Sequence, residues 1–139
     1  MQRARHLVAR WSDSMKRLIV ESWTLLVFAG FIMRFRGLDA LYQTIRTQHV
    51  RSVPARTRPT LEMLCRFMDL ACVFYPTRVM CLQRSAATTL LLRRHGRIAE
   101  MIIGAQVLPL MSHAWVEIDG TVVNDKPYMR DIYRVLERC

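Results

Sequence analysis

The chain has 139 residues, of which 52% are hydrophobic, and this composition excludes a disordered chain and predicts one domain with its own core. Its formal net charge is +10, and the excess lies in residues 1–60, which hold 11 Lys and Arg against 3 Asp and Glu. Such a positive field suits an acidic peptide or protein, an anionic membrane surface or nucleic acid, or is simply a solvated basic face. No zinc finger, recognition helix or aromatic-interleaved basic strand is present in the sequence, so we predict no nucleic-acid partner.

The cysteines and the apolar stretches indicate a cellular compartment. The four cysteines show no C-x-x-C pair and no tight cluster with histidine, which predicts free thiols, a reducing compartment and neither a metal nor a cofactor. The longest strongly apolar stretch, residues 23–33, is shorter than the roughly 20 residues that span a bilayer. Glu21 and the lack of a small-residue cleavage site also argue against a signal peptide. We therefore predict a cytoplasmic protein.

The first half of the chain is predicted to be helical. Apolar residues recur every three or four positions over residues 12–35, and the second half of this helix is apolar nearly all round, so the domain, a partner protein or a membrane interface must cover it. Gly37 ends it, and a shorter helix is expected at 38–47. Residues 48–59 contain two prolines and three arginines and are predicted to form a linker. This division gives a helical segment, 1–58, that packs on or docks a core, 59–139.

The second half is predicted to contain two helices, a sheet and a terminal helix. Thr60 is the expected N-cap of a helix that Pro76 stops, and a second helix, 81–95, is closed by Gly96. Its uncharged middle predicts a buried, central position. Strands are expected at 99–104, 112–118 and 121–125, and Pro127 opens the terminal helix with inward-facing Met129, Ile132 and Leu136. The fold class is α+β, in which a helical layer precedes a helix packed on a small antiparallel sheet.

Cys81, at the expected start of a helix, and His113, 32 residues later in a strand, are the candidate catalytic pair. Thiols with a pKa of about 8.5 are mostly protonated at neutral pH, whereas a helix N-terminus and a neighbouring imidazolium favour the nucleophilic thiolate. A third group is needed to hold the imidazole in the right tautomer. Asp119 lies at a hairpin tip about 20 Å along the strand from His113, which leaves Asp125.

Whether Asp125 reaches His113 depends on the turn, because side chains alternate between the faces of a strand. A two-residue Asp119-Gly120 loop would send Asp125 to the face opposite His113. A three-residue loop with Gly120 in a left-handed bulge would place Asp125 directly opposite His113, so we predict the bulged turn. The alternative role of Asp125 is to cap the terminal helix, and Asn124 is a weaker candidate for orienting the histidine.

Four motifs in the second half of the chain have a characteristic order and spacing. They are CLQRS at 81–85, LLRRHG at 91–96, IIGA at 102–105 and HAWVEIDG at 113–120. Together they resemble the leader peptidase of lasso peptide biosynthesis, a member of the transglutaminase-like cysteine protease superfamily. The likeness runs from about residue 59 to residue 125. It implies a papain- or transglutaminase-like core and a proteolytic triad of Cys81, His113 and Asp125.

The resemblance also implies a substrate and partners. The substrate is a ribosomally made precursor peptide whose leader is removed before an ATP-dependent cyclase closes the ring. The chain resembles the stand-alone form, which needs a separate leader-binding protein. We expect the basic N-terminal layer to dock that protein or the leader, with Arg51, Arg56 and Arg58 as candidates.

In the expected mechanism, Cys81 attacks the scissile carbonyl, His113 acts as base and then as acid, and Asp125 orients His113. The backbone N–H of Cys81 is one expected oxyanion donor. Arg84, Ser85 and Trp115 are expected to support the site by packing or hydrogen bonding. Acyl transfer to an amine and a non-catalytic binding role stay open as alternatives.

Overall fold

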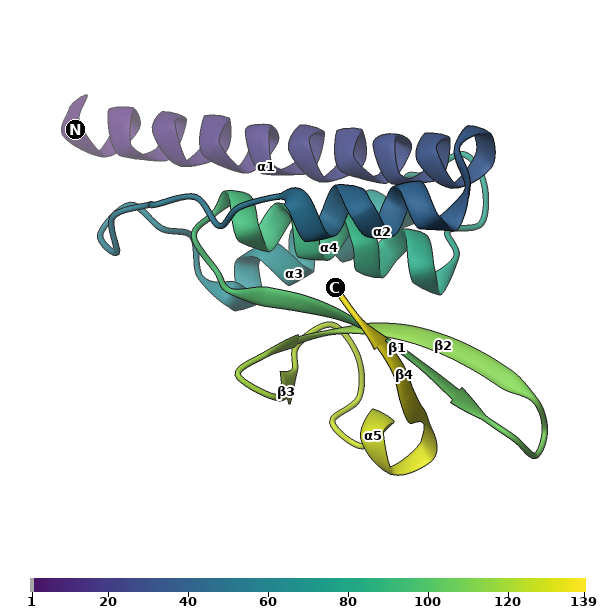
Figure 1. Cartoon of the computed structure of the whole chain (residues 1–139). Coiled ribbons are helices and arrows are strands. Elements are labelled where there is room, and N and C mark those ends of the chain that lie inside the picture. Colours follow the sequence, from purple (N-terminus) through teal and green to yellow (C-terminus); the bar gives the residue numbers. More distant parts are fainter. Residues whose placement is uncertain (1) are drawn as a thin grey trace.

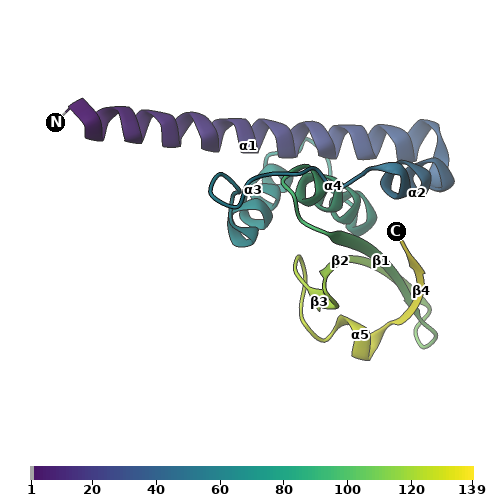
Figure 2. The same cartoon turned by 60° about the vertical axis from the view of Figure 1, so that its left-hand side comes forward.

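The computed structural model describes the backbone of residues 2–139 and the side chains of residues 12–139. Helix α1 (Gln2–Phe35) lies across one side of the molecule and covers α2 (Gly37–Thr47), α3 (Leu61–Val73) and α4 (Cys81–Arg94) (Figure 1). The sheet lies on the far side of α4 from α1, and both views show this order of layers (Figure 2). The predicted α+β class is confirmed.

Helix α4 is the central element of the fold. Ten of its 14 residues are buried, because its uncharged middle packs against α1 and α3 on one side and against β1 and β2 on the other. Its boundaries agree with the sequence prediction, since Gly96 adopts a left-handed φ of 80° just beyond its end. One hydrophobic cluster joins the N-terminal helices to the rest of the chain, with Leu26, Leu41, Leu64 and Leu91 among its members. The division at residue 58 stays a prediction.

Helix α1 has two apolar faces, of which only one is covered. Leu18, Leu25, Leu26, Ala29 and Ile32 are buried against the other helices. The opposite face leaves large side chains exposed, among them Val20, Trp23, Val27, Phe28, Phe31 and Phe35. The stretch Ser12–Phe35 is long and apolar enough to cross a membrane by length and composition, although a helix that is partly in a soluble core passes the same test. The shorter run 23–33 argued against a membrane span, but the length of the whole stretch does not exclude one.

The predicted linker is held against the end of α4. The N–H of Arg51 donates to the carbonyl of Arg93 at 2.9 Å, and the Arg93 side chain donates to the carbonyl of Ile45. Arg97 donates to the carbonyl of Pro59 at 3.1 Å. Thr60 then caps α3 as predicted, by accepting from the N–H of Met63 at 3.2 Å.

The antiparallel sheet has the strand order β3-β2-β1-β4. Its strands are β1 (Ala99–Gln106), β2 (Met111–Ile118), β3 (Thr121–Val122) and β4 (Arg134–Arg138). One face meets α4 through residues such as Met101 and Val116. The other face carries a second, smaller cluster that contains Trp115 and Ile102. The sheet therefore has a covered face toward the helices and a second face that carries its own cluster.

The predicted terminal helix is wrong in its extent. Helix α5 covers only Met129–Ile132, and the chain then becomes extended at Tyr133 and pairs with β1 as β4. Ile132 is 44% and Leu136 63% exposed, so only Met129 of the three expected inward residues is buried. The alternating residues Tyr133 and Val135 pack on the second cluster instead. Pairing with the open edge of β1 thus outweighs the helical spacing of residues 129, 132 and 136.

Candidate active site

Cys81 is the first residue of α4, as predicted, and its side chain is half-buried. Met80 precedes it without a side-chain cap, and the first backbone bond of the helix runs from the N–H of Arg84 to the carbonyl of Met80 at 2.9 Å. The N–H groups of residues 81–83 are therefore left without partners in the helix, which makes this end a suitable place to bind an oxyanion.

Gln83 fastens this end of α4 to α1. Its amide Nε2 donates to the carbonyl of Leu26 at 2.9 Å, and both residues are buried. A side chain at Gly30 would come within 2.7 Å of that nitrogen, so glycine is needed for the close approach. Sequence reasoning gave Gln83 no role beyond its place in a motif.

The turn after β2 differs from the prediction. Ile118 pairs with Thr121 and Glu117 with Val122, which leaves Asp119 and Gly120 as a flush two-residue loop. Both loop residues have positive φ, 49° and 75°, as a type I′ turn requires. The predicted three-residue bulged turn is wrong.

Asp125 still reaches His113, because the chain leaves the sheet earlier than the sequence predicted. Val123 makes the last backbone bond of this ladder, from its N–H to the carbonyl of Val116 at 2.9 Å. The N–H of Val116 donates to the side-chain Oδ1 of Asn124 at 2.7 Å. In a continuing ladder a backbone carbonyl of the opposite strand would accept this bond. Beyond this point face alternation no longer applies, and Asp125 is released from the position that a longer strand would give it.

His113 and Asp125 form a short hydrogen bond. Nε2 of His113 lies 2.6 Å from Oδ2 of Asp125, and the two side chains are 24% and 21% exposed. Oδ1 of Asp125 accepts from the N–H of Lys126 at 2.8 Å, which fixes the carboxylate. An ionised carboxylate only accepts, so the tautomer that fits this bond has its proton on Nε2 and Nδ1 as its acceptor nitrogen.

An aromatic wall holds the imidazole of His113. The ring of Tyr133 lies 5.4 Å from it and that of Trp115 lies 6.3 Å away, centroid to centroid. A side chain at Gly104, the residue paired with His113, would come within 2.7 Å of the Trp115 ring and 2.8 Å of Tyr133. The glycine therefore permits the wall to form beside the histidine.

A buried carboxylate anchors Trp115 in turn. Glu117 is fully buried, and Trp115 Nε1 donates to its Oε1 at 2.8 Å. Burial raises the pKa of Glu117, but hydrogen bonds from Arg130 and Trp115 outweigh this effect and bring the pKa below its usual value. The expected supporting role of Trp115 thus has a structural basis.

Ser85 ties the nucleophile helix to the histidine strand. Its hydroxyl donates to the carbonyl of Ala114 at 2.9 Å and accepts from Nδ2 of Asn124 at 3.2 Å, and all three residues are buried. Ser85 stands one turn beyond Cys81 and Ala114 follows His113 directly. Among the described residues no hydrogen bond joins Cys81 to His113 itself, so the two are linked through this bridge.

The remaining predicted residues lie elsewhere. Arg84 donates to Oδ1 of Asp69 at 2.5 Å and so joins α4 to α3. Arg51, Arg56 and Arg58 lie near the opposite end of α4 from Cys81, where they line two adjoining hollows.

Burial affects the thiols of Cys65, Cys72 and Cys139. Burial raises the pKa of Cys65 to about 11, and burial also raises the pKa values of Cys72 and Cys139. These thiols are therefore poor nucleophiles at neutral pH. Within the described part of the chain, no group of three or more His, Cys, Asp or Glu side chains is arranged to hold a metal.

Comparison with known proteins adds a family to this geometry. Residues 25–138 match the family model described as the transglutaminase-like superfamily. The chain belongs to the transglutaminase-like superfamily. The match begins in the second half of α1, so it takes in α2 and the segment before α3 as well as the sheet.

A curated relative of this transglutaminase-like chain is the microcin J25-processing protein McjB of Escherichia coli. The two are 41% identical over 56 residues, which is 40% of this chain and 27% of the relative. The similarity therefore spans only about a quarter of that protein's length. No solved structure matches the chain significantly.

Asn124 and Glu117, like Gln83, have structural roles that the sequence did not reveal. Asn124 was considered only as a second choice for orienting His113, whereas it ends the β2–β3 ladder and binds Ser85. A polar residue at the end of a short strand was the available signal, because such side chains often replace backbone partners. Glu117 had a comparable signal, since it is a charged residue between the apolar residues Val116 and Ile118 of a predicted strand.

Proposed function

We propose that the chain is a cysteine peptidase that removes the leader from a ribosomally synthesised lasso precursor peptide. The 2.6 Å hydrogen bond between His113 and Asp125 carries this proposal, since it gives a strand histidine the fixed orientation that a general base needs. Membership of the transglutaminase-like superfamily and the similarity to a protein named for processing microcin J25 support it.

In the proposed mechanism Cys81 is the nucleophile. Nδ1 of His113 takes the thiol proton, the thiolate attacks the scissile carbonyl, and the leaving amine of the core receives that proton from the imidazolium. Water, deprotonated by the same nitrogen, then hydrolyses the thioester and releases the leader as a carboxylate. Asp125 orients the ring and stabilises its charged form.

The N-terminus of α4 supplies the proposed oxyanion site. The backbone N–H groups of residues 81–83 have no partner within the helix, and the positive end of the helix dipole favours an anion there. The proposed mechanism requires the Cys81 thiol and the His113 imidazole to come within hydrogen-bond distance in the substrate complex, and catalytic contacts of this kind are often longer in free enzymes.

The proposed setting is the cytoplasm, with a separate leader-binding protein that delivers the precursor and a cyclase that takes the freed core. No cofactor is needed for this chemistry. Acyl transfer to an amine remains the second candidate, because the superfamily match is to transglutaminase-like proteins.

Product masses test the proposal. The chain is incubated with a precursor and its leader-binding protein, and the products are weighed by mass spectrometry. Hydrolysis yields two peptides whose masses sum to the precursor plus one water. A product in which the leader is joined to an amine would establish transfer instead, and an unchanged precursor would contradict both activities.

A further inference from the structure

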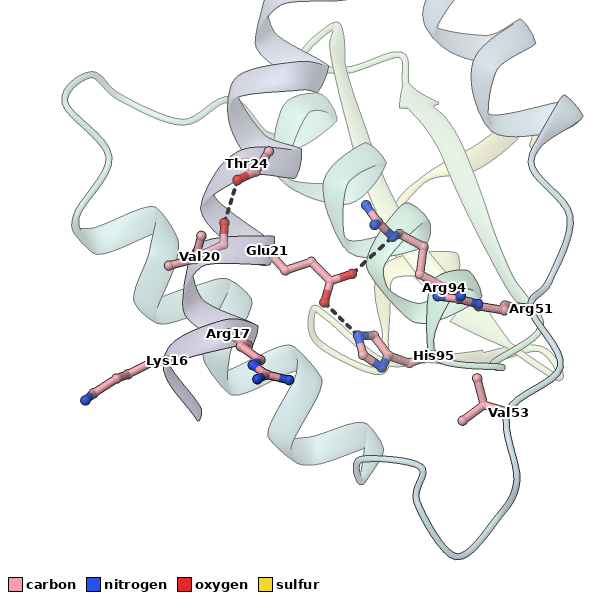
Figure 3. A pocket seen from close by; sticks show the side chains of 9 residues that line it. All are labelled: Lys16, Arg17, Val20, Glu21, Thr24, Arg51, Val53, Arg94 and His95. Atoms are coloured by element: carbon pink, nitrogen blue, oxygen red, sulfur yellow. Dashed lines mark hydrogen bonds and ion pairs between the residues drawn. The ribbon is translucent and has the colours of Figure 1, made fainter. Parts of the chain in front are cut away.

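A basic groove lies at the end of α4 remote from Cys81. It consists of two hollows of about 750 and 540 Å³ that share Arg17, Glu21 and His95 in their linings. Figure 3 shows the larger hollow, in which side chains from α1, from the segment after α2 and from the end of α4 surround Glu21. Besides Arg94, five basic side chains of the described residues line the groove, namely Lys16, Arg17, Arg51, Arg56 and Arg58.

The charge of the groove is not compensated from within. Glu21 is the one acidic residue among the described residues that line the two hollows, and it is already paired, with Oε1 3.1 Å from Arg94 and Oε2 2.9 Å from His95 (Figure 3). The hydrogen bond from His95 is the main reason why the pKa of Glu21 lies below its usual value. In the part of the chain with described side chains, none of the five basic residues has an ion-pair partner of its own. The groove therefore presents a net positive charge to a ligand.

Apolar side chains complete the lining of the groove. Val20 and Val53 lie in the larger hollow, and Leu18, Pro59 and Met63 in the smaller. A complementary ligand consequently carries acidic groups together with apolar side chains. Among residues 12–139, whose side chains are described, no Phe, Tyr or Trp lines either hollow, so these residues offer no stacking platform for a single-stranded nucleic acid.

Backbone contacts hold the groove in shape. The N–H of Arg51 is bonded to Arg93 at 2.9 Å, and the guanidinium of Arg58 donates to the carbonyl of Val53 at 2.9 Å. Arg58 also packs over Gly96, where an added side chain would come within 3.2 Å of its Nε. Arg58 thus stabilises the loop, whereas the exposed side chains of Arg17, Arg51 and Arg56 are available to a ligand.

The length of α4 sets the distance from the groove to the nucleophile. The helix has 14 residues, and 14 residues at about 1.5 Å each span about 20 Å. An extended peptide covers that distance in about six residues. A substrate bound at Cys81 can therefore enter the groove with residues about six or more positions from the cut.

We propose that the basic groove binds an acidic segment of the precursor's leader, about six or more residues from the scissile bond. This inference rests on the proposed leader peptidase function. The leader is the better part of the substrate to hold, because it is discarded after cleavage, whereas tight binding of the core would delay its transfer to the next step. A concave site with apolar walls also fits a peptide chain better than a flat membrane surface.

Binding is measured first, without any cleavage. The probe is a fluorescein-labelled twelve-residue peptide of repeated Glu-Glu-Leu triplets, and a Gln-Gln-Leu peptide of the same length is its uncharged counterpart. Binding of each peptide to the protein is measured by fluorescence anisotropy. The variant Arg17→Glu/Arg51→Glu/Arg56→Glu is expected to raise Kd for the acidic peptide at least tenfold. The control Arg34→Glu/Arg36→Glu/Arg66→Glu changes the net charge equally at exposed positions outside the groove and is expected to stay within twofold of the wild type.

Equal loss in both variants would overturn the groove as the site, and so would equal binding of the charged and uncharged peptides. Stronger competition by phosphatidylserine vesicles or by a 20-nucleotide oligo-dT than by the isolated leader would assign the surface to a different partner. An isolated core that competes better than the isolated leader would overturn the choice of the leader.

Cleavage kinetics then separate this inference from the proposed function. The groove variant is expected to raise KM for the full precursor at least tenfold with kcat within twofold, and to cleave a substrate shortened to five leader residues as the wild type does. A wild type that cleaves nothing would refute the peptidase, while the binding data still decide on the groove. An effect seen only when the leader-binding protein is present, without binding of the leader alone, would assign the groove to that protein.

Discussion

The two ends of α4 are built in different ways. At the end near Cys81, apart from the exposed Arg84–Asp69 ion pair, the contacts are made by neutral buried groups, and Ser85, Ala114 and Asn124 share hydrogen bonds that salt does not screen. At the other end, Arg94 and His95 hold Glu21 beside an open groove with uncompensated positive charge. The first end gives fixed geometry and the second gives long-range attraction, so we expect catalysis and recognition to respond to different perturbations.

Apart from loss of the nucleophile itself, the largest effect is expected from Asp125 at the catalytic end. Asp125→Ala leaves the Nε2 proton of His113 without its acceptor, so the ring is free to adopt the wrong tautomer and orientation. We expect kcat for precursor cleavage to fall by about 1,000- to 10,000-fold. Steady-state kinetics give this value, and a fall of less than tenfold would show that another group orients His113.

The second-largest effect on kcat is expected from Asn124, which positions the segment that carries Asp125 and takes no part in the reaction itself. Asn124→Ala removes the acceptor of the buried Val116 N–H, which costs about 1–3 kcal/mol of the free energy of unfolding. It also frees the segment that carries Asp125, so kcat should fall while KM stays nearly constant. Denaturant unfolding and kinetics check both effects.

Ser85→Ala is the matched variant for this test, since it removes the link from Asn124 to α4, together with the bond to the Ala114 carbonyl, but keeps the bond between Asn124 and Val116. It should cost less than Asn124→Ala, and the two substitutions should not be additive, because they share a hydrogen bond. Additive losses would contradict a connected Ser85–Asn124 bridge.

The hairpin shows what the sequence could and could not predict about this end. The start of α4 at Cys81 and the Thr60 cap follow from local signals, and the structure agrees with both. The bulged turn was predicted so that His113 and Asp125 would share a strand face, on the assumption that β3 continues to residue 125. Asp119 and Gly120 instead take the tight turn that their own conformational preferences favour.

The features that the sequence did not predict depend on tertiary contacts. The early end of β3 depends on a buried side chain, Asn124, that binds two other segments, and the strand β4 depends on the open edge of β1. Neither of these tertiary contacts can be recognised from the neighbouring residues in the sequence. The His113–Asp125 pair was expected for one reason and is seen in the structure for another.

Salt is expected to distinguish the two ends with a smaller effect. Raising NaCl from about 50 mM to about 500 mM shortens the Debye length from about 14 Å to about 4 Å and weakens attraction at the basic groove. We expect KM for the full precursor to rise about three- to tenfold with little change in kcat. A fall in kcat at constant KM would place the salt-sensitive contacts at the catalytic end instead.

The smallest effect is expected from Glu21 at low pH. Its pKa is lowered in the folded chain, so the unfolded chain binds the proton more readily, and the stabilisation is complete above pH 4.5 and lost as pH falls through the folded pKa. We expect a loss of about 1 kcal/mol or less. Urea unfolding between pH 3 and 6 should show this loss in the wild type and a flatter profile in Glu21→Gln. Identical profiles would mean that the ion pairs at this end do not stabilise the fold.

The nucleophile itself gives the most direct test. Cleavage of the precursor is compared for the wild type, Cys81→Ala and Cys65→Ala, where Cys65 is a partly buried thiol with a pKa of about 11. We predict that Cys81→Ala abolishes detectable release of the core and that Cys65→Ala keeps kcat within a few-fold of the wild type. Release of the core by Cys81→Ala at the wild-type rate would contradict the assignment of Cys81 and with it the proposed mechanism.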